Sequence, residues 1–143
     1  MKDFSHQKWE LEMVKKHPIL YREYGHSEMR TCMHYGFAIY KGWYTIIEAL
    51  SNDLEILMEH SGYIIVAKQV KEKFGGLRFY TSIYDSIQDA EADLAGHGIG
   101  SNGQDWVRQC WWGLINRVVA HYEDVAGNTC ERCGEIKQKC KCE

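Results

Sequence analysis

The pattern of apolar and polar positions predicts two helices in the first half of the chain. Asp3 or Ser5 can cap a first helix, which ends at His17 because the following proline disfavours the α conformation before it. A second helix follows Gly42 and ends at Gly62, since glycine readily adopts the left-handed conformation at a helix C-terminus. The apolar residues that recur at helical spacing in the second helix are Trp43, Ile46, Ile47, Leu50, Leu54 and Leu57.

Two further helices are predicted in the second half of the chain, on either side of a glycine-rich loop. Asp85 or Ser86 can cap a short acidic helix that runs up to the loop at 96–103. A longer helix over about 104–126 carries an apolar stripe and ends at Gly127-Asn128. The residues of this predicted stripe are Val107, Cys110, Trp111, Leu114, Val118 and Tyr122.

A β-hairpin is predicted between the second and third helices. Two runs of alternating character, about 63–74 and 77–84, flank Gly75 and Gly76. Glycine supplies the positive φ that a two-residue hairpin turn requires, so these two residues are predicted to be the centre of the turn. Lys68 and Glu72 interrupt one otherwise apolar face. The apolar residues of that predicted core face are Ile64, Val66, Val70, Phe74, Leu77, Phe79 and Ile83.

The opposite face of the predicted hairpin is basic and carries Lys71, Lys73, Arg78 and Tyr80. In this register Lys73 lies directly opposite Arg78, and like charges in that position repel unless a negative group lies between them. Two interpretations stay open. The face is either solvated or paired with the acidic stretch Asp85–Asp93, or it is an anion site in which the three bases hold a phosphate and Tyr80 stacks or donates its hydroxyl. A one-residue bulge would move one arm's side chains to the other face.

Together these elements predict an α+β fold, with a small antiparallel sheet centred on the hairpin and packed by three to four helices. Residues 18–42 hold many aromatic and apolar side chains and are expected to pack on the core as an irregular segment. The chain of 143 residues is long enough for one domain with its own core. We therefore expect an α+β domain over 1–128 and a metal-binding tail over 129–143.

The cysteines at the end of the chain give the clearest chemical signal. Cys130 and Cys133 form a C-x-x-C pair, and Cys140 and Cys142 form a C-x-C pair. Four thiolates at this spacing predict a C-terminal zinc knuckle, in which Zn²⁺ is structural because no coordination position is left for water. The alternatives are disulfides, a reactive tail, or replacement of one tail ligand by Cys32 or a histidine.

Charge and hydropathy narrow the classes of function. The net charge of −3 excludes nucleic-acid binding by bulk charge, so such binding would need a local patch. No signal peptide is apparent and no apolar run approaches the length of a membrane span, so we expect a cytoplasmic protein with no membrane partner. In that reducing compartment cysteines are more often thiols or metal ligands than disulfides.

Motifs with a known mechanism are missing elsewhere in the sequence. Gly98, Gly100 and Gly103 match G-x-G-x-x-G, but a predicted helix precedes them and no βαβ unit surrounds them, so a loop is the better interpretation. Neither the histidines nor any serine forms a recognisable catalytic motif. We therefore expect a protein that acts by binding, and keep an enzyme of unknown reaction as an alternative.

The order of segments resembles a functionally uncharacterised family of small proteins from tailed bacteriophages and prophages. The resemblance covers nearly the whole chain, and its most specific block is the hairpin QVKEKFGGLRFY. Where this chain has GFAIYKGW, family members tend to have GFECGDGW. The matching blocks are HPILYR (17–22), CMHYGF (32–37), GWYTIIEAL (42–50), QVKEKFGGLRFY (69–80), DAEA (89–92) and CERCG (130–134).

The resemblance implies a phage-encoded accessory protein. Our first expectation is that it binds and inhibits a host factor in the host cytoplasm, as in counter-defence, with a host protein complex as its partner. The second is a nucleotide or nucleic-acid binding protein that uses the basic hairpin face.

Overall fold

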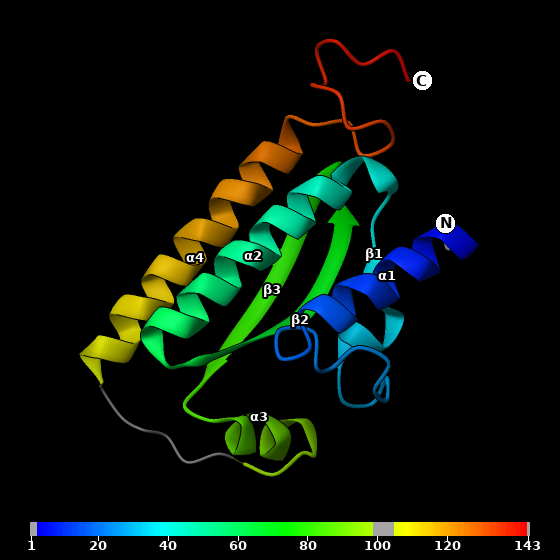
Figure 1. The fold of residues 1–143 in the computed structure, drawn as a ribbon. Helices are drawn as coiled ribbons and strands as arrows, with labels where there is room; N and C mark the ends of the chain where they lie inside the picture. Colours follow the sequence, from blue (N-terminus) through cyan, green and yellow to red (C-terminus); the bar gives the residue numbers. More distant parts are fainter. Residues whose placement is uncertain (1–2, 99–104, 143) are drawn as a thin grey trace.

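The computed structural model describes residues 3–98 and 105–142, and these form four α-helices and one three-stranded sheet (Figure 1). The predicted α+β class is confirmed. Two positions of the G-x-G-x-x-G match, Gly100 and Gly103, lie outside the described residues. In chain order the elements are α1 (Phe4–Lys16), the 3₁₀ turn η1 (Cys32–Tyr35), β1 (Phe37–Ala38), the 3₁₀ turn η2 (Lys41–Trp43), α2 (Tyr44–Ser61), β2 (Ile64–Lys73), β3 (Gly76–Tyr84), α3 (Ile87–Leu94) and α4 (Trp106–Gly127).

The helix boundaries follow the predicted caps. The Asp3 side chain accepts a hydrogen bond from the His6 amide at 2.9 Å, which satisfies one of the free N–H groups in the first turn of α1. The Ser86 hydroxyl caps α3 in the same way, and Gly62 ends α2 with φ of 79°. These three predictions are confirmed. Sequence could predict them because each cap depends only on neighbouring residues.

The sheet is mixed, because the short strand β1 pairs in parallel with β2 while β2 and β3 pair antiparallel. Strand order is β1-β2-β3, so β2 is central and β3 is an edge strand. The side-by-side helices α2 and α4 cover one face, and α3 packs at the far end of the hairpin from its turn (Figure 1). The sequence analysis missed β1, which has two residues and no alternating pattern of its own.

The predicted register of the hairpin is wrong by one residue. Phe74 and Gly75 are the central residues of the turn, with φ of 55° and 78°, and Lys73 pairs with Gly76. As a result Lys71, and not Lys73, lies opposite Arg78. The Glu72 carboxylate accepts a hydrogen bond from the Gly75 amide at 2.7 Å and so stabilises the observed turn.

A β-bulge at Lys68, between Ala67 and Gln69, decides which side chains face the core. Phe74, predicted to be in the core, is 92% exposed at the turn. Val66 and Tyr84 lie on the opposite face and pack with Ala90 of α3. The strand residues that do face the main core are Ile65, Ala67, Val70, Leu77, Phe79 and Ile83.

Lys68 itself is accounted for by an ion-pair network. Its ammonium group pairs with the carboxylate of Glu23, which is 1% exposed, and lies 3.6 Å from Asp93 of α3. Tyr84 donates a hydrogen bond to the same Asp93 carboxylate. The acidic helix α3 therefore balances the positive charge of Lys68 at the bulge. It does not balance the charges of the basic residues nearer the turn.

The buried face of α4 differs from the predicted stripe. Ile115, Val119 and Ala126 are buried against the core, whereas Val107 and Leu114 are 43% and 42% exposed. Several apolar residues lie on more than one side of α4, so helical periodicity did not select the face that packs against α2 and β3.

The edge of β3 is covered by side chains from α4. The Phe79 amide donates to the Glu123 carboxylate at 2.9 Å, and the guanidinium of Arg108 donates to the Ile83 carbonyl at 2.8 Å. These are edge groups that another strand would otherwise pair. The helix thus ends the sheet at β3.

Candidate metal centre and hairpin arm

The chain after α4 folds into a compact knuckle, which we define as residues 129–142. Thr129 bridges Ile136, the Cys130 amide donates to the Glu135 carbonyl at 2.7 Å, and the Gly134 amide donates to the Cys130 carbonyl at 2.9 Å. Gly134 has φ of 82°, a conformation that glycine adopts without steric cost. This tight turn brings Cys133 back beside Cys130.

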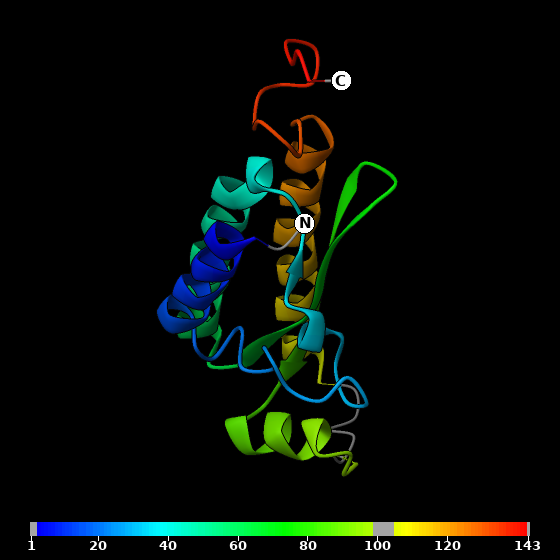
Figure 2. The same ribbon diagram turned by 90° about the vertical axis from the view of Figure 1, so that its right-hand side faces the viewer.

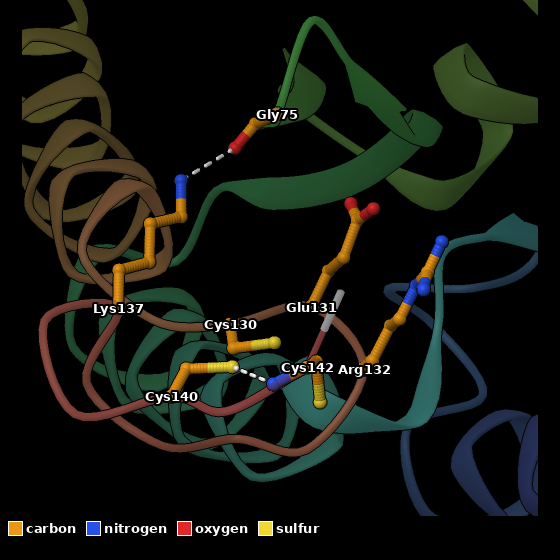
Figure 3. A pocket seen from close by; sticks show the side chains of 7 residues that line it. All are labelled: Gly75, Cys130, Glu131, Arg132, Lys137, Cys140 and Cys142. Carbon is orange, nitrogen blue, oxygen red and sulfur yellow. Dashed lines mark hydrogen bonds between the residues drawn. The ribbon is translucent and has the colours of Figure 1, made fainter.

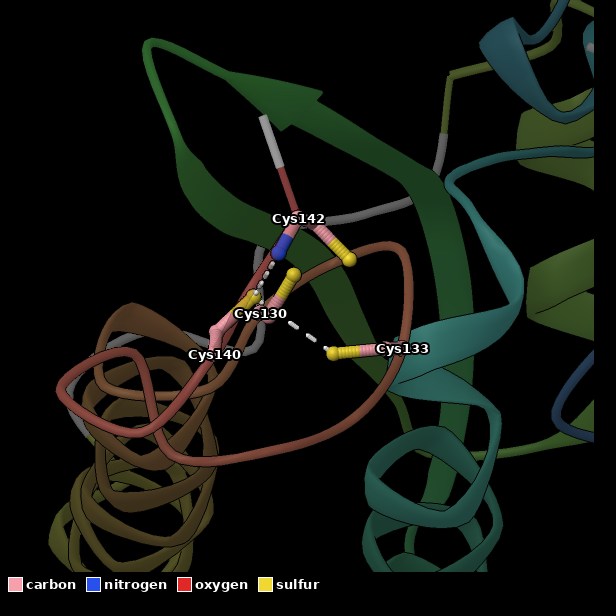
Figure 4. Close-up of side chains that lie close together, drawn as sticks. All are labelled: Cys130, Cys133, Cys140 and Cys142. Atoms are coloured by element: carbon pink, nitrogen blue, oxygen red, sulfur yellow. Dashed lines mark hydrogen bonds between the residues drawn. The ribbon is translucent and has the colours of Figure 1, made fainter.

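The four predicted cysteines converge at one point (Figure 4). Their sulfur atoms all lie within 4.8 Å of one another, and those of Cys133 and Cys140 are 3.5 Å apart. Sulfur atoms about 3.8 Å apart are expected around a tetrahedral metal with metal–sulfur bonds of about 2.3 Å. The cluster can therefore hold a metal ion. Its members are Cys130, Cys133, Cys140 and Cys142.

The alternatives for the tail are not observed among the described residues. All six cysteines are free thiols, so no disulfide joins the tail. Cys32 lies exposed in η1 and Cys110 lies exposed in α4, and neither belongs to the cluster. No histidine of the described residues joins it either.

The knuckle backbone favours a thiolate at one of its cysteines. Hydrogen bonds from the Cys133 amide, the Cys140 thiol and the Arg132 amide lower the pKa of Cys130 to about 6. At Cys140 the Cys142 amide favours the thiolate, but the Cys130 side chain, burial and the Cys133 side chain together outweigh it and raise the pKa to about 12. A bound cation would favour thiolates at all four cysteines.

The knuckle docks on the start of α2. The Gly42 amide donates to the Glu131 carbonyl at 2.7 Å, and the indole N–H of Trp43 donates to the Thr129 carbonyl at 3.0 Å. A Cβ atom on Gly42 would lie 2.3 Å from the carbonyl oxygen of Cys130. Only glycine therefore permits this close approach of two backbones.

A second contact joins the knuckle to the hairpin turn (Figure 3). The Lys137 ammonium donates to the Gly75 carbonyl at 3.2 Å. A cavity of about 340 Å³ lies between the turn and the cysteines. Burial, and then the nearby Glu72 carboxylate, raise the pKa of Glu131 on the wall of this cavity. The knuckle thus contacts both α2 and the turn.

We define the hairpin arm as residues 69–80, which include the four predicted ligand-binding residues Lys71, Lys73, Arg78 and Tyr80. Lys71 and Arg78 are cross-strand partners, and Tyr80 is 46% exposed and pairs with Gln69. No carboxylate within the described residues forms an ion pair with any of the three bases. The predicted pairing of this face with the acidic helix is therefore not found.

Sequence reasoning missed the residue at the tip of the arm. Phe74 is 92% exposed and has φ of 55°, which is a rare conformation for a bulky side chain. The ammonium of Lys73 lies 5.7 Å from the centre of its ring, within the range of a cation–π contact. A signal was present in the sequence, since Phe74-Gly75 as well as Gly75-Gly76 can supply a two-residue turn.

Comparison of the chain with protein-family models, curated proteins and solved structures finds no match. Within the described parts of the chain, no helix has the length and apolar character needed to cross a membrane.

Proposed function

We propose that the metal held by the knuckle is one structural Zn²⁺ ion. Four soft sulfur ligands at tetrahedral spacing suit Zn²⁺, and the complete set leaves no position for a substrate or water. The basic residues Arg132, Lys137, Lys139 and Lys141 offset the formal charge of −2 of such a centre.

Elemental analysis of protein purified without added metal tests the zinc proposal. We expect about one equivalent of zinc for the native chain, and its loss when Cys133 and Cys140 are both changed to Ser. A matched Cys32→Ser, Cys110→Ser variant should keep the metal. Less than about half an equivalent in the native protein would contradict the proposal.

We further propose that the protein acts by binding, and that the hairpin arm binds the sugar-phosphate backbone of single-stranded nucleic acid. The observation that carries this proposal is the cross-strand pair of Lys71 and Arg78, which has no carboxylate partner among the described residues. Like charges directly opposite each other are destabilising, so the pair favours an external anion. A phosphate between them would accept charge-assisted hydrogen bonds from both.

Aromatic side chains next to these bases favour nucleic acid over a free inorganic anion. Phe74 at the tip and Tyr80 on the basic face are both exposed. Proteins that bind single strands without sequence preference combine basic residues that follow the backbone with aromatic rings on which bases stack. The turn of the arm lies at the edge of the molecule, away from α1 and α2 (Figure 2), where a strand can reach it.

Fluorescence anisotropy with a labelled oligothymidine tests this proposal. We expect saturable binding, and its loss when Lys71, Lys73 and Arg78 are all changed to Ala. The control changes three exposed lysines of α1, Lys8, Lys15 and Lys16, to Ala and removes the same charge. Equal losses in the two variants, or no binding by the native protein, would contradict the proposal.

A second candidate is an accessory protein that binds and inhibits a host protein complex, as the phage resemblance implies. The observation that favours it is the exposed apolar side of α4, where Trp106 is 71% exposed and Val107 and Leu114 are each more than 40% exposed. Large apolar residues grouped on a surface are typical of protein interfaces.

Affinity purification from infected host cells separates the two candidates. If the second holds, Leu114→Glu abolishes retention of a host complex, whereas the triple change at Lys71, Lys73 and Arg78 leaves it intact. The reverse result would favour the nucleic-acid proposal.

A further inference from the structure

A second cavity, of about 420 Å³, also has Arg132 of the knuckle in its wall. The start of α1, the turn η2, the first residue of α2 and the knuckle together form its walls. These segments are far apart in the sequence. The residues that line the cavity are Asp3, Ser5, His6, Tyr40, Lys41, Tyr44 and Arg132.

A series of hydrogen-bonded polar groups, most of them buried, leads to this cavity. Glu10 and His6 are 1% and 3% exposed, and the His6 Nε2 atom lies 3.3 Å from the Glu10 carboxylate and 2.8 Å from the Phe37 carbonyl. Since a carbonyl can only accept, Nε2 carries a proton. The other ring nitrogen, Nδ1, lies 2.5 Å from the hydroxyl of Tyr44, which lines the cavity.

Contacts within the fold account for the position of Glu10, but not for that of the Tyr44 hydroxyl at the cavity. One Glu10 carboxylate oxygen accepts from the Phe37 amide at 2.6 Å and the other from the Tyr24 hydroxyl at 3.0 Å, so this carboxylate ties α1 to β1. The Tyr44 hydroxyl, in contrast, has His6 as its hydrogen-bond partner and can make further bonds toward the cavity. Its ring is fixed by stacking on Trp9 at 3.9 Å between centroids.

The charges and hydroxyls of the cavity suit an anionic ligand. Lys41 and Arg132 supply two positive charges, and among the described lining residues Asp3 is the one carboxylate, already used to cap α1. The first turn of α1 adds backbone N–H groups and the positive end of the helix dipole. The cavity volume falls within the range of small-molecule sites, about 300–1,000 Å³.

We propose that this cavity binds a small phosphate monoester. Lys41 and Arg132 pair with the phosphate. The Tyr44 hydroxyl donates to His6 Nδ1, because the ring proton is on Nε2, and the Tyr44 oxygen accepts a hydrogen bond from a hydroxyl of the ligand. The hydroxyls of Ser5 and Tyr40 provide hydrogen bonds for the polar remainder of the ligand. This site is separate from the hairpin arm and does not depend on nucleic-acid binding.

Titration of the metal-loaded, full-length protein with glycerol 3-phosphate, inorganic phosphate and acetate, followed by two-dimensional ¹H–¹⁵N NMR, tests the proposal. We expect saturable shifts of the Ser5, Lys41 and Tyr44 amides with both phosphates, and tighter binding of the ester. Weaker binding of acetate, by at least about tenfold, is expected because a carboxylate has fewer acceptor sites and less charge. Acetate binding as tight as that of the ester would overturn the phosphate assignment.

Two variants and one control variant keep the proposal falsifiable. Tyr44→Phe preserves the stacked ring and Lys41→Ala removes an exposed side chain, so both should fold, and each should weaken glycerol 3-phosphate binding by about fivefold or more. Lys15→Ala, an exposed lysine at the other end of α1, should leave binding unchanged. Unchanged affinity in both cavity variants, or no saturable shift in the native protein, would overturn the proposal.

Discussion

At Gly42 the backbone of the knuckle approaches the backbone of the rest of the protein closely. We predict that Gly42→Ala lowers the free energy of unfolding by about 1–3 kcal/mol, because the added methyl group would overlap the Cys130 carbonyl oxygen at 2.3 Å. The affinity of the cysteine cluster for a metal ion should fall as well, since the backbone at Cys130 must move. Urea unfolding and competition with a zinc chelator measure the two effects.

A matched control is Gly113→Ala in α4. Gly113 has open space around its Cα, so alanine there should stabilise the helix by about 0.5–1 kcal/mol. An equal effect of the two substitutions would contradict the close approach at Gly42.

A substitution of Phe74, at the tip of the arm, should change stability and binding in opposite directions. We predict that Phe74→Asn raises the free energy of unfolding by about 1 kcal/mol, because asparagine tolerates the observed φ of 55° and Asn-Gly is a preferred hairpin turn. The same change should weaken oligothymidine binding, since a stacking surface is lost. Denaturant unfolding and anisotropy measure the two effects on one sample.

The control for Phe74 is Phe4→Asn, which removes another exposed phenylalanine, 83% exposed at the start of α1. We expect neither stabilisation nor a change in binding. A Phe74→Asn variant that is less stable than the native protein would contradict the turn assigned here.

Tyr122 is predicted to titrate at an unusually high pH. Its hydroxyl donates to Asp53 at 2.5 Å, and this hydrogen bond, followed by burial, raises its pKa to about 12 from 10.0. Because the folded state holds the proton more tightly, the stabilising contribution is present below pH 10 and is lost as pH rises from about 10 to about 12. The measurement is tyrosinate absorbance as a function of pH, in the native protein and in the Asp53→Asn variant. The pKa of Tyr122 should be lower in the variant. Identical titration curves would contradict this interaction.

At the scale of elements, α4 covers the edge of β3. We predict that Glu123→Ala destabilises the protein by about 1–3 kcal/mol, because the buried Phe79 amide loses its acceptor. Asp124→Ala, at the neighbouring exposed position, removes the same charge without this contact and should have a small effect. Thermal unfolding compares the two variants, and equal melting temperatures would contradict the role of Glu123.

Local sequence signals predicted the helices and strands well. The hairpin register and the packed face of α4 depend on contacts between distant residues and were not predicted. Caps at Asp3, Ser86 and Gly62 depend on adjacent residues, so the ends of the helices follow from sequence. The register of the hairpin does not, because three consecutive residues offer two possible turns, and the bulge at Lys68 shifts the far ends of the strands by one further residue. The packed face of α4 depends in the same way on its neighbours.

At the scale of the whole molecule, the knuckle fastens the C-terminus to both α2 and the hairpin turn. Removal of the metal should therefore loosen contacts beyond the tail, namely those at Gly42, Trp43 and Gly75. We predict faster hydrogen exchange of the Gly42 amide and a changed Trp43 environment after chelation. Hydrogen exchange with and without chelator is the measurement, and protection of Gly42 that is independent of metal would contradict the role of the knuckle.

The candidate sites differ in how far sequence could reveal them. The four cysteines lie within thirteen residues, so their spacing alone predicted the cluster. The sequence predicted the basic residues of the arm. Only the observed register shows which two of them lie opposite each other. The cavity lined by His6, Tyr44 and Arg132 was not predicted, because its residues converge only when distant segments fold together.

The most direct test of the central claim, that the arm binds single-stranded nucleic acid, is the salt dependence of oligothymidine affinity. For three phosphate contacts, by Lys71, Lys73 and Arg78, we expect the logarithm of the association constant to fall with a slope of about −2 against the logarithm of salt concentration. The slope should approach zero when the three bases are changed to Ala and should stay near −2 when Lys8, Lys15 and Lys16 are changed instead. A slope near zero for the native protein, or one unaltered by loss of the arm's bases, would contradict the claim.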